Sequence, residues 1–157
     1  LRHAGLKALA SLRMEKGYRD YGHDIDNTDS VLEAGLGFAV ALDKPDGFIG
    51  RDALLAQRDR GVQRRLVQFA LDDPTPLLLH GEPIFRDGEC VGHLTSAMYG
   101  HTIGSSIGMG YVHAPSADVP RRWFEEGSYS IEVAGVAISA RASLRPLFDP
   151  GSDRIHA

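Results

Sequence analysis

Several features are scarce in this sequence of 157 residues, and each scarcity excludes a class of protein. The single cysteine, Cys90, cannot form an internal disulfide and is compatible with a reducing compartment, so we expect a cytoplasmic location. No apolar run approaches the roughly eighteen residues of a membrane-spanning helix. The net charge of −4 argues against a nucleic-acid surface, and we expect neither nucleic acid nor membrane as a partner. Because the chain begins at Leu1 without a methionine, we expect it to be a piece of a longer protein.

Signatures of catalysis are equally scarce. The seven histidines lack the spacing of a ligand pair, so we expect no metal site. The segment 104–108 is rich in glycine, but the lysine and the following helix of a phosphate loop are absent. The Gly35-Leu-Gly37 run leads into an expected strand instead of a helix, which argues against a dinucleotide site. Cys90 follows an acidic residue that does not favour a reactive thiolate, and we interpret it as part of a β-structure.

Apolar residues make up 43% of the chain, enough to form a core, and the first 61 residues have a mixed pattern. Helical spacing of leucines predicts a helix over 3–16 that ends at Gly17, followed by a polar loop over 18–30. Asp29 or Ser30 is suited to cap a short helical turn that ends at Gly35. The apolar run 37–42 predicts a buried strand, and 50–60 predicts an amphipathic helix.

The character changes after Gly61, where β-prone runs alternate with turns. The sequence predicts a strand over 64–71, a hairpin around Asp87-Gly88, a strand over 106–112 and a hairpin that turns near Gly135. We therefore predict an α+β fold in which the end of an α/β subdomain (1–61) precedes a small antiparallel β-barrel of about six strands (62–148). Residues 149–157 form a polar tail that we expect to fray.

The Tyr18–Asp26 loop has the highest density of polar and aromatic side chains. Tyrosine rings stack on planar heterocycles, and Arg13 and Arg19 can bind carboxylates in a bidentate manner. The alternative is a connecting loop whose polar groups satisfy one another. The Arg64-Arg65 pair could bind an anionic ligand tail, and the alternative is that both side chains are only solvated. The segment 95–102 is predicted to be a loop that either closes over a site or connects two strands.

Short motifs spread over most of the chain resemble one family. In order along the sequence, the C-terminal half of the glycine-cleavage T-protein (aminomethyltransferase) family is matched by Leu12-Arg-Met-Glu-Lys-Gly17, Tyr21-Gly-His-Asp24, Leu32-Glu-Ala-Gly-Leu36, Phe48-Ile-Gly-Arg51, Gly81-Glu-Pro-Ile84, Val91-Gly92, Thr95-Ser96 and Gly110-Tyr-Val112. The form of the segment 11–19 and the ending 144–150 are most similar to the FAD-dependent dimethylglycine and sarcosine dehydrogenases.

The resemblance implies a module that binds tetrahydrofolate between three subdomains, with an α/β (ferredoxin-like) subdomain before the barrel. It implies that Tyr21, Phe38, Arg13 and Glu15 contact the cofactor, with Tyr21 the best candidate. The alternative for Arg13 and Glu15 is a structural pair at the helix end. T-proteins usually carry Arg-Asp where this chain has Leu9 and Ala10, which removes one ligand contact. The family's catalytic Asp and pterin-reading Glu belong to an N-terminal half that this chain lacks.

The expected function is therefore that of a C-terminal fragment of a tetrahydrofolate-linked, flavin-dependent dimethylglycine or sarcosine dehydrogenase, or of an aminomethyltransferase. The fragment alone should be inactive, with FAD bound by N-terminal domains of the parent protein, its expected partners. One alternative is a non-catalytic barrel for structure or subunit contacts that has lost folate binding. Another is a relative that acts on a different methylated substrate, such as a sulfonium compound.

Overall fold

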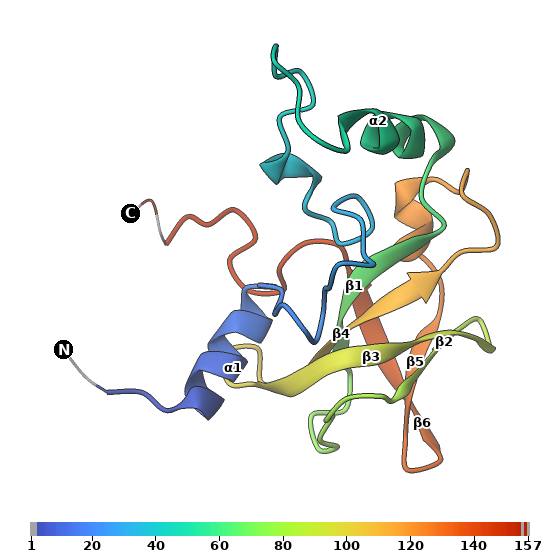
Figure 1. Cartoon of the computed structure of the whole chain (residues 1–157). Coiled ribbons are helices and arrows are strands. Elements are labelled where there is room, and N and C mark those ends of the chain that lie inside the picture. The colour runs from blue at the N-terminus through green and yellow to red at the C-terminus, as the bar shows by residue number, and fades with distance from the viewer. Residues whose placement is uncertain (1–2, 155, 157) are drawn as a thin grey trace.

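The computed structural model, which describes residues 3–154 and 156, has a closed barrel of antiparallel strands at its centre (Figure 1). The strand order around the barrel is β1-β4-β3-β2-β5-β6, and β6 pairs with β1 to close it. The strands are β1 (Arg64–Leu71), β2 (Pro83–Arg86), β3 (Glu89–Gly100), β4 (Ser105–His113), β5 (Tyr129–Val133) and β6 (Val136–Ser143). The predicted antiparallel barrel of about six strands is confirmed.

Two hairpin turns show why the strands reverse where the sequence predicted. Asp87 and Gly88, between β2 and β3, have φ of 51° and 89°. Ala134 and Gly135, between β5 and β6, have φ of 50° and 80°. Positive φ at both central residues is the type I′ geometry, whose twist matches that of paired strands.

The two faces of β1 bury different residues, as the alternating sequence of this strand requires. Val67, Phe69 and Leu71 belong to the main core cluster of the barrel. Leu66 and Ala70 belong to a second cluster that includes Met14 of α1 (Leu6–Glu15). Burial on both faces follows because α1 packs against β3 and β4 outside the barrel.

Strands β3 and β4 approach each other closely at two glycines. A Cβ atom at Gly92 would collide with the carbonyl oxygen of Tyr111, and one at Gly110 would collide with that of His93. Glycine is therefore required at both positions of this pair of strands.

The segment before the barrel contains helices and turns. Its elements are α1, the short 3-10 helix η1 (Gly37–Ala39) and α2 (Arg51–Arg60), and a further 3-10 helix, η2 (Arg121–Phe124), lies between β4 and β5. The ends predicted for both α-helices are confirmed, since Gly17 and Gly61 have φ of 65° and 87°. Nothing in α2 is fully buried. No helix in the described part of the chain is long and apolar enough to span a bilayer.

Three expectations were wrong. The run 37–42 is not a buried strand, because its amides bond locally, from Ala39 N to Leu36 O at 2.9 Å, and the Phe38 side chain is exposed. The range 95–102 is not a loop, because β3 continues to Gly100 through its pairing with β4. The first residues of the tail do not fray, because Lys16 Nζ donates to the carbonyl oxygen of Asp149 at 2.7 Å.

Candidate ligand-binding site

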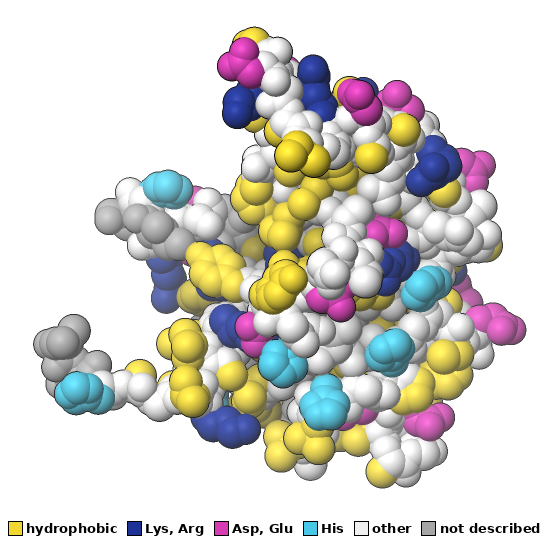
Figure 2. Space-filling model, viewed as in Figure 1, with side chains coloured by type: hydrophobic (Ala, Val, Ile, Leu, Met, Phe, Trp, Pro, Cys, Tyr) yellow, Lys and Arg dark blue, Asp and Glu magenta, His cyan; other side chains and the backbone are white. Residues whose placement is uncertain are grey.

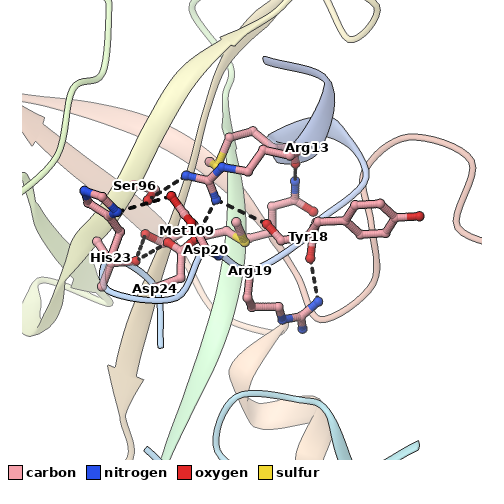
Figure 3. A network of polar contacts seen from close by, with 12 residues as sticks. Arg13, Tyr18, Arg19, Asp20, His23, Asp24, Ser96 and Met109 are labelled. Atoms are coloured by element: carbon pink, nitrogen blue, oxygen red, sulfur yellow. Dashed lines mark hydrogen bonds and ion pairs between the residues drawn. The ribbon is translucent and has the colours of Figure 1, made fainter. Parts of the chain in front are cut away.

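The Tyr18–Asp26 loop is fixed from within by one buried carboxylate (Figure 3). Asp24 is only 1% exposed and accepts three hydrogen bonds. Its Oδ2 atom accepts from Arg13 Nη1 at 2.5 Å and from the Asp20 amide at 2.9 Å. Its Oδ1 atom accepts from Thr95 Oγ1 of β3 at 2.8 Å. A buried charge needs such compensation, so Asp24 joins the loop to α1 and to the barrel wall.

Arg13 uses the rest of its guanidinium on the protein as well. Its Nη2 atom donates to Ser96 Oγ at 3.0 Å, and its Nη1 atom also donates to the carbonyl oxygen of Tyr18 at 3.2 Å. These bonds hold the guanidinium in one place, between α1, the loop and β3. The arrangement favours the structural role for Arg13, while a role in contacting a ligand stays a prediction.

Glu15 lies apart from Arg13 and has partners of its own. Its side chain is buried, at 2% exposure, and Oε1 accepts from the amides of Thr102 and Ile103 at 2.5 and 3.3 Å. Its carbonyl oxygen accepts from the Phe148 amide at 3.1 Å. Arg13 and Glu15 are therefore each bonded to other parts of the fold, which agrees with a structural role for both, although their bonds are to other residues and not to each other.

The aromatic candidates are in the opposite situation. Tyr21 is 71% exposed and Phe38 is 87% exposed, and Tyr18 is exposed too. In Figure 3 the Tyr18 ring points away from the polar network around Asp24. Rings left open in this way are available to stack on a planar group.

A cleft of about 1020 Å³ brings part of this set together. We call it the Phe38 cleft. Its walls come from the C-cap of α1, the Tyr18–Asp26 loop, the segment around η1, the residues after β6, and single residues of β1 and η2. The surface in Figure 2 is indented between the η1 segment and the C-terminal segment. It is lined by Lys16, Tyr18, Arg19, Ile25, Leu32, Gly35, Leu36, Gly37, Phe38, Arg65, Arg121, Leu144, Arg145, Pro146 and Ser152. The cleft therefore joins two candidate aromatic residues to several cations, whereas Tyr21, Arg13 and Glu15 are not among its lining residues.

The two members of the Arg64-Arg65 pair have different surroundings in the structure. Arg64 forms ion pairs with Asp29 at 2.8 Å and Glu33 at 3.2 Å, so its charge is compensated. Arg65 lies on the Phe38 cleft and only donates weakly to the carbonyl oxygen of Leu32, at 3.4 Å. Burial lowers the pKa of Arg65, and the nearby charge of Arg121 lowers this pKa further.

Arg121 and Arg145 were missed as site residues. They lie on η2 and after β6, far from the Tyr18–Asp26 loop in the sequence; Arg145 belongs to the 144–150 segment that resembles the dehydrogenases, but no ligand contact was assigned to that segment. The signal available for Arg121 was its charge alone, which most surface arginines share. Among the described residues, no group of three or more His, Cys, Asp or Glu side chains is placed so that it could hold a metal ion.

Comparisons with known proteins agree with the barrel fold. The family described as "Glycine cleavage T-protein C-terminal barrel domain" matches residues 64–149, and "GCVT N-terminal domain" matches residues 1–44. The chain is 41% identical over 155 residues to 4-methylaminobutanoate oxidase (formaldehyde-forming) of Paenarthrobacter nicotinovorans. It is 42% identical over 154 residues to mitochondrial sarcosine dehydrogenase of Homo sapiens.

These alignments cover most of this chain but little of the relatives. They span 99% and 98% of the chain, but only 18% and 17% of the two enzymes. The crystal structure of the glycine cleavage system aminomethyltransferase T from Bartonella henselae superposes with a TM-score of 0.75 at 27% identity, over 91% of this chain and 38% of that protein. The barrel, the segment before it and these matches show that the chain belongs to the glycine cleavage T-protein family.

Proposed function

We propose that this chain is the C-terminal part of a tetrahydrofolate-linked enzyme that oxidises an N-methyl amine, and that it helps to bind folate. The observation that carries the proposal is the Phe38 cleft, in which exposed rings and arginines lie together. Folate combines a planar heterocycle, an aromatic ring and carboxylates, which are the groups that such a surface binds. The relatives named for the oxidation of methylated amines support the choice of reaction.

The chain's own residues would supply binding and no chemical step. Phe38 and Tyr18 offer rings for stacking, and Tyr21 offers a third exposed ring on the neighbouring loop. Arg13 would act indirectly, since it holds Asp24 and hence the loop that carries Tyr21. Tetrahydrofolate, when bound, accepts the one-carbon unit released by oxidation. The flavin and the catalytic carboxylate belong to domains that the resemblance places before this chain.

Two measurements test the proposal. The purified 157-residue chain should show no turnover of sarcosine, dimethylglycine or 4-methylaminobutanoate, and turnover by the chain alone would contradict it. In the full-length protein, calorimetric titration with tetrahydrofolate should show weaker binding after Tyr21→Ala and after Phe38→Ala. Each stacked ring is worth about 1 kcal/mol, or roughly fivefold in Kd. Unchanged affinity in both variants would remove these rings from the site.

One observation favours a second function, a structural barrel for subunit or domain contacts. Leu9 replaces the usual arginine of the family and is 60% exposed on α1, beside the exposed Leu6 and Leu12. Such a leucine row is suited to packing against another domain rather than to binding a charged ligand. If the full-length protein oxidises its amine with no measurable affinity for tetrahydrofolate, this second function replaces the first.

A further inference from the structure

The Phe38 cleft is unusual for its charge. Besides Lys16, it is lined by the four arginines Arg19, Arg65, Arg121 and Arg145, which we call the arginine set, and none of its described lining residues is acidic. Lys16 is already paired with Asp149 at 3.3 Å. Among the described ion pairs, none includes a member of the arginine set, whereas Arg13, Arg58, Arg64, Arg86, Arg122 and Arg141 each pair with a carboxylate.

Two members of the arginine set are held in position by the protein without being neutralised. Arg19 donates from Nη1 to the Gly17 carbonyl at 2.5 Å and from Nε to the Ala34 carbonyl at 3.0 Å. Arg65 lies with its guanidinium carbon 5.7 Å from the centre of the Phe124 ring, and its Nε atom is buried without a hydrogen-bond partner. A buried donor left without an acceptor is costly, and no ion pair of Arg65 in the described structure offsets this cost.

The other two members are exposed and come from separate segments. Arg121 begins η2, and Arg145 follows the end of β6. Bringing like charges from four separate segments together is unfavourable in the absence of a counter-charge. It is more notable in a chain whose net charge is −4, because carboxylates are abundant elsewhere on it.

From these observations we infer that the Phe38 cleft binds a multiply charged anion, with carboxylate or phosphate groups held by Arg65, Arg121 and Arg145. Guanidinium groups bind both kinds of oxyanion through paired hydrogen bonds. The site stands on the charges of the arginine set, so it does not require that folate is the ligand. If folate is the ligand, its carboxylate end would lie here, and the missing arginine at Leu9 would be replaced by cations from other segments.

The test uses calorimetric titration of the full-length protein with two probes, a glutamate tripeptide and pyrophosphate. The double variant Arg121→Ala/Arg145→Ala should weaken binding of the preferred probe by about tenfold or more, since it removes two charged donors. The matched control is Arg122→Ala/Arg141→Ala, which removes two exposed arginines outside the cleft and lowers the net charge equally. We expect the control to change Kd by less than about twofold, through long-range charge alone.

The outcomes are distinct. Preference for the tripeptide identifies a carboxylate ligand, and preference for pyrophosphate identifies a phosphate ligand. Absence of binding by both probes, or an equal loss in both double variants, overturns the inference. Folate binding that depends on Tyr21 and Phe38 but not on the arginine set would leave the proposed function in place and refute the anion site. Probe binding that depends on the arginine set, in a protein that does not bind folate, would support the anion site and refute the proposed function. Unchanged thermal midpoints would show that the exposed substitutions leave the fold intact.

Discussion

The barrel and the segment before it are stabilised in different ways. The barrel has a closed ladder of strands around a core that includes Phe69, Ile84 and Ile131, all fully buried. The segment before it has few buried side chains and is attached to the barrel through Met14, the polar contacts of Arg13 and Glu15, and the ion pairs of Arg64 with Asp29 and Glu33. Most of the large exposed apolar side chains lie in this segment, among them Leu6, Leu9, Leu12, Phe38 and Ile49. The barrel is therefore a self-contained packing unit, whereas the segment presents surfaces that its own packing does not use.

The largest expected effect contrasts two phenylalanines. Phe69→Ala removes a fully buried ring that lies 5.3 Å from the ring of Tyr129, and should lower the free energy of unfolding by about 4 kcal/mol. Phe38→Ala, on the exposed η1, should change it by less than about 0.5 kcal/mol. Urea titration monitored by circular dichroism measures both. A comparable loss in the two variants would abolish the distinction between the regions.

Asp24→Asn should produce the next largest effect, because it leaves the Arg13 guanidinium without its buried counter-charge. We expect a loss of about 3 kcal/mol in the free energy of unfolding. Asp43→Asn, at an exposed position, serves as the control and should be nearly neutral. Hydrogen exchange should show faster opening of the Tyr18–Asp26 loop in Asp24→Asn while the barrel amides stay protected. If the barrel opened equally, the two regions would unfold as one unit.

The barrel itself should lose stability in alkali. Burial raises the pKa of Tyr129 from 10.0 to about 12, and the nearby Arg86 opposes the rise. Because the pKa of Tyr129 is higher in the fold than in the unfolded chain, the neutral tyrosine stabilises the fold. Its contribution to the free energy of unfolding is complete below pH 10 and is lost as the pH rises through 12. The expected loss is about 2 to 3 kcal/mol.

The variant Tyr129→Phe shows how much of the alkaline loss of stability is due to this tyrosine. Burial also raises the pKa of Tyr111, so some alkaline loss should persist in Tyr129→Phe. That variant also loses the hydrogen bond from Tyr129 to the carbonyl oxygen of Phe124 at 3.1 Å. The free energy of unfolding of Tyr129→Phe, measured between pH 8 and 12, should therefore be lower than that of the wild type at pH 8 and should decrease less steeply as the pH rises. An unchanged slope would show that Tyr129 does not titrate with the fold.

The smallest effect concerns a cap in the first segment. Ser30 and Glu33 form a reciprocal capping box, in which the Glu33 amide donates to Ser30 Oγ at 3.1 Å and the Ser30 amide donates to Glu33 Oε2 at 3.0 Å. Ser30→Ala should cost about 1 kcal/mol. Ser30→Asp should recover part of the loss in a thermal melt, since aspartate also caps. A loss that Asp does not recover would indicate a packing effect.

Much of the barrel could be predicted because its signals are local. Alternation of Val67, Phe69 and Leu71 marks β1, and the Asp87-Gly88 turn fixes the first hairpin. The error at 37–42 has a physical cause. An apolar run predicts a strand only if another strand is available to pair with it, and Phe38 has none in the described structure.

The candidate site was predictable only in part. Tyr18, Tyr21 and Phe38 stand out as aromatic residues in polar or glycine-rich surroundings, and the structure leaves all three exposed. Within the arginine set, Arg19 and Arg65 were candidates for anion binding from the sequence, whereas their meeting with Arg121 and Arg145 could not be predicted, because the fold and not the sequence spacing brings the four together. That Arg64 is ion-paired while Arg65 lines the Phe38 cleft depends likewise on which face of β1 each residue occupies.

The pairing of β1 with β6 has a consequence for the order of events during synthesis. Gln68 of β1 lies opposite Ser143 of β6, so the barrel cannot close until the chain as far as Ser143 has left the ribosome. Until then β1 can pair with β4 on one side only, and its other edge is open to strands of neighbouring chains. Premature termination before β6 should therefore yield a chain that self-associates, which gives the final strand a protective role during translation.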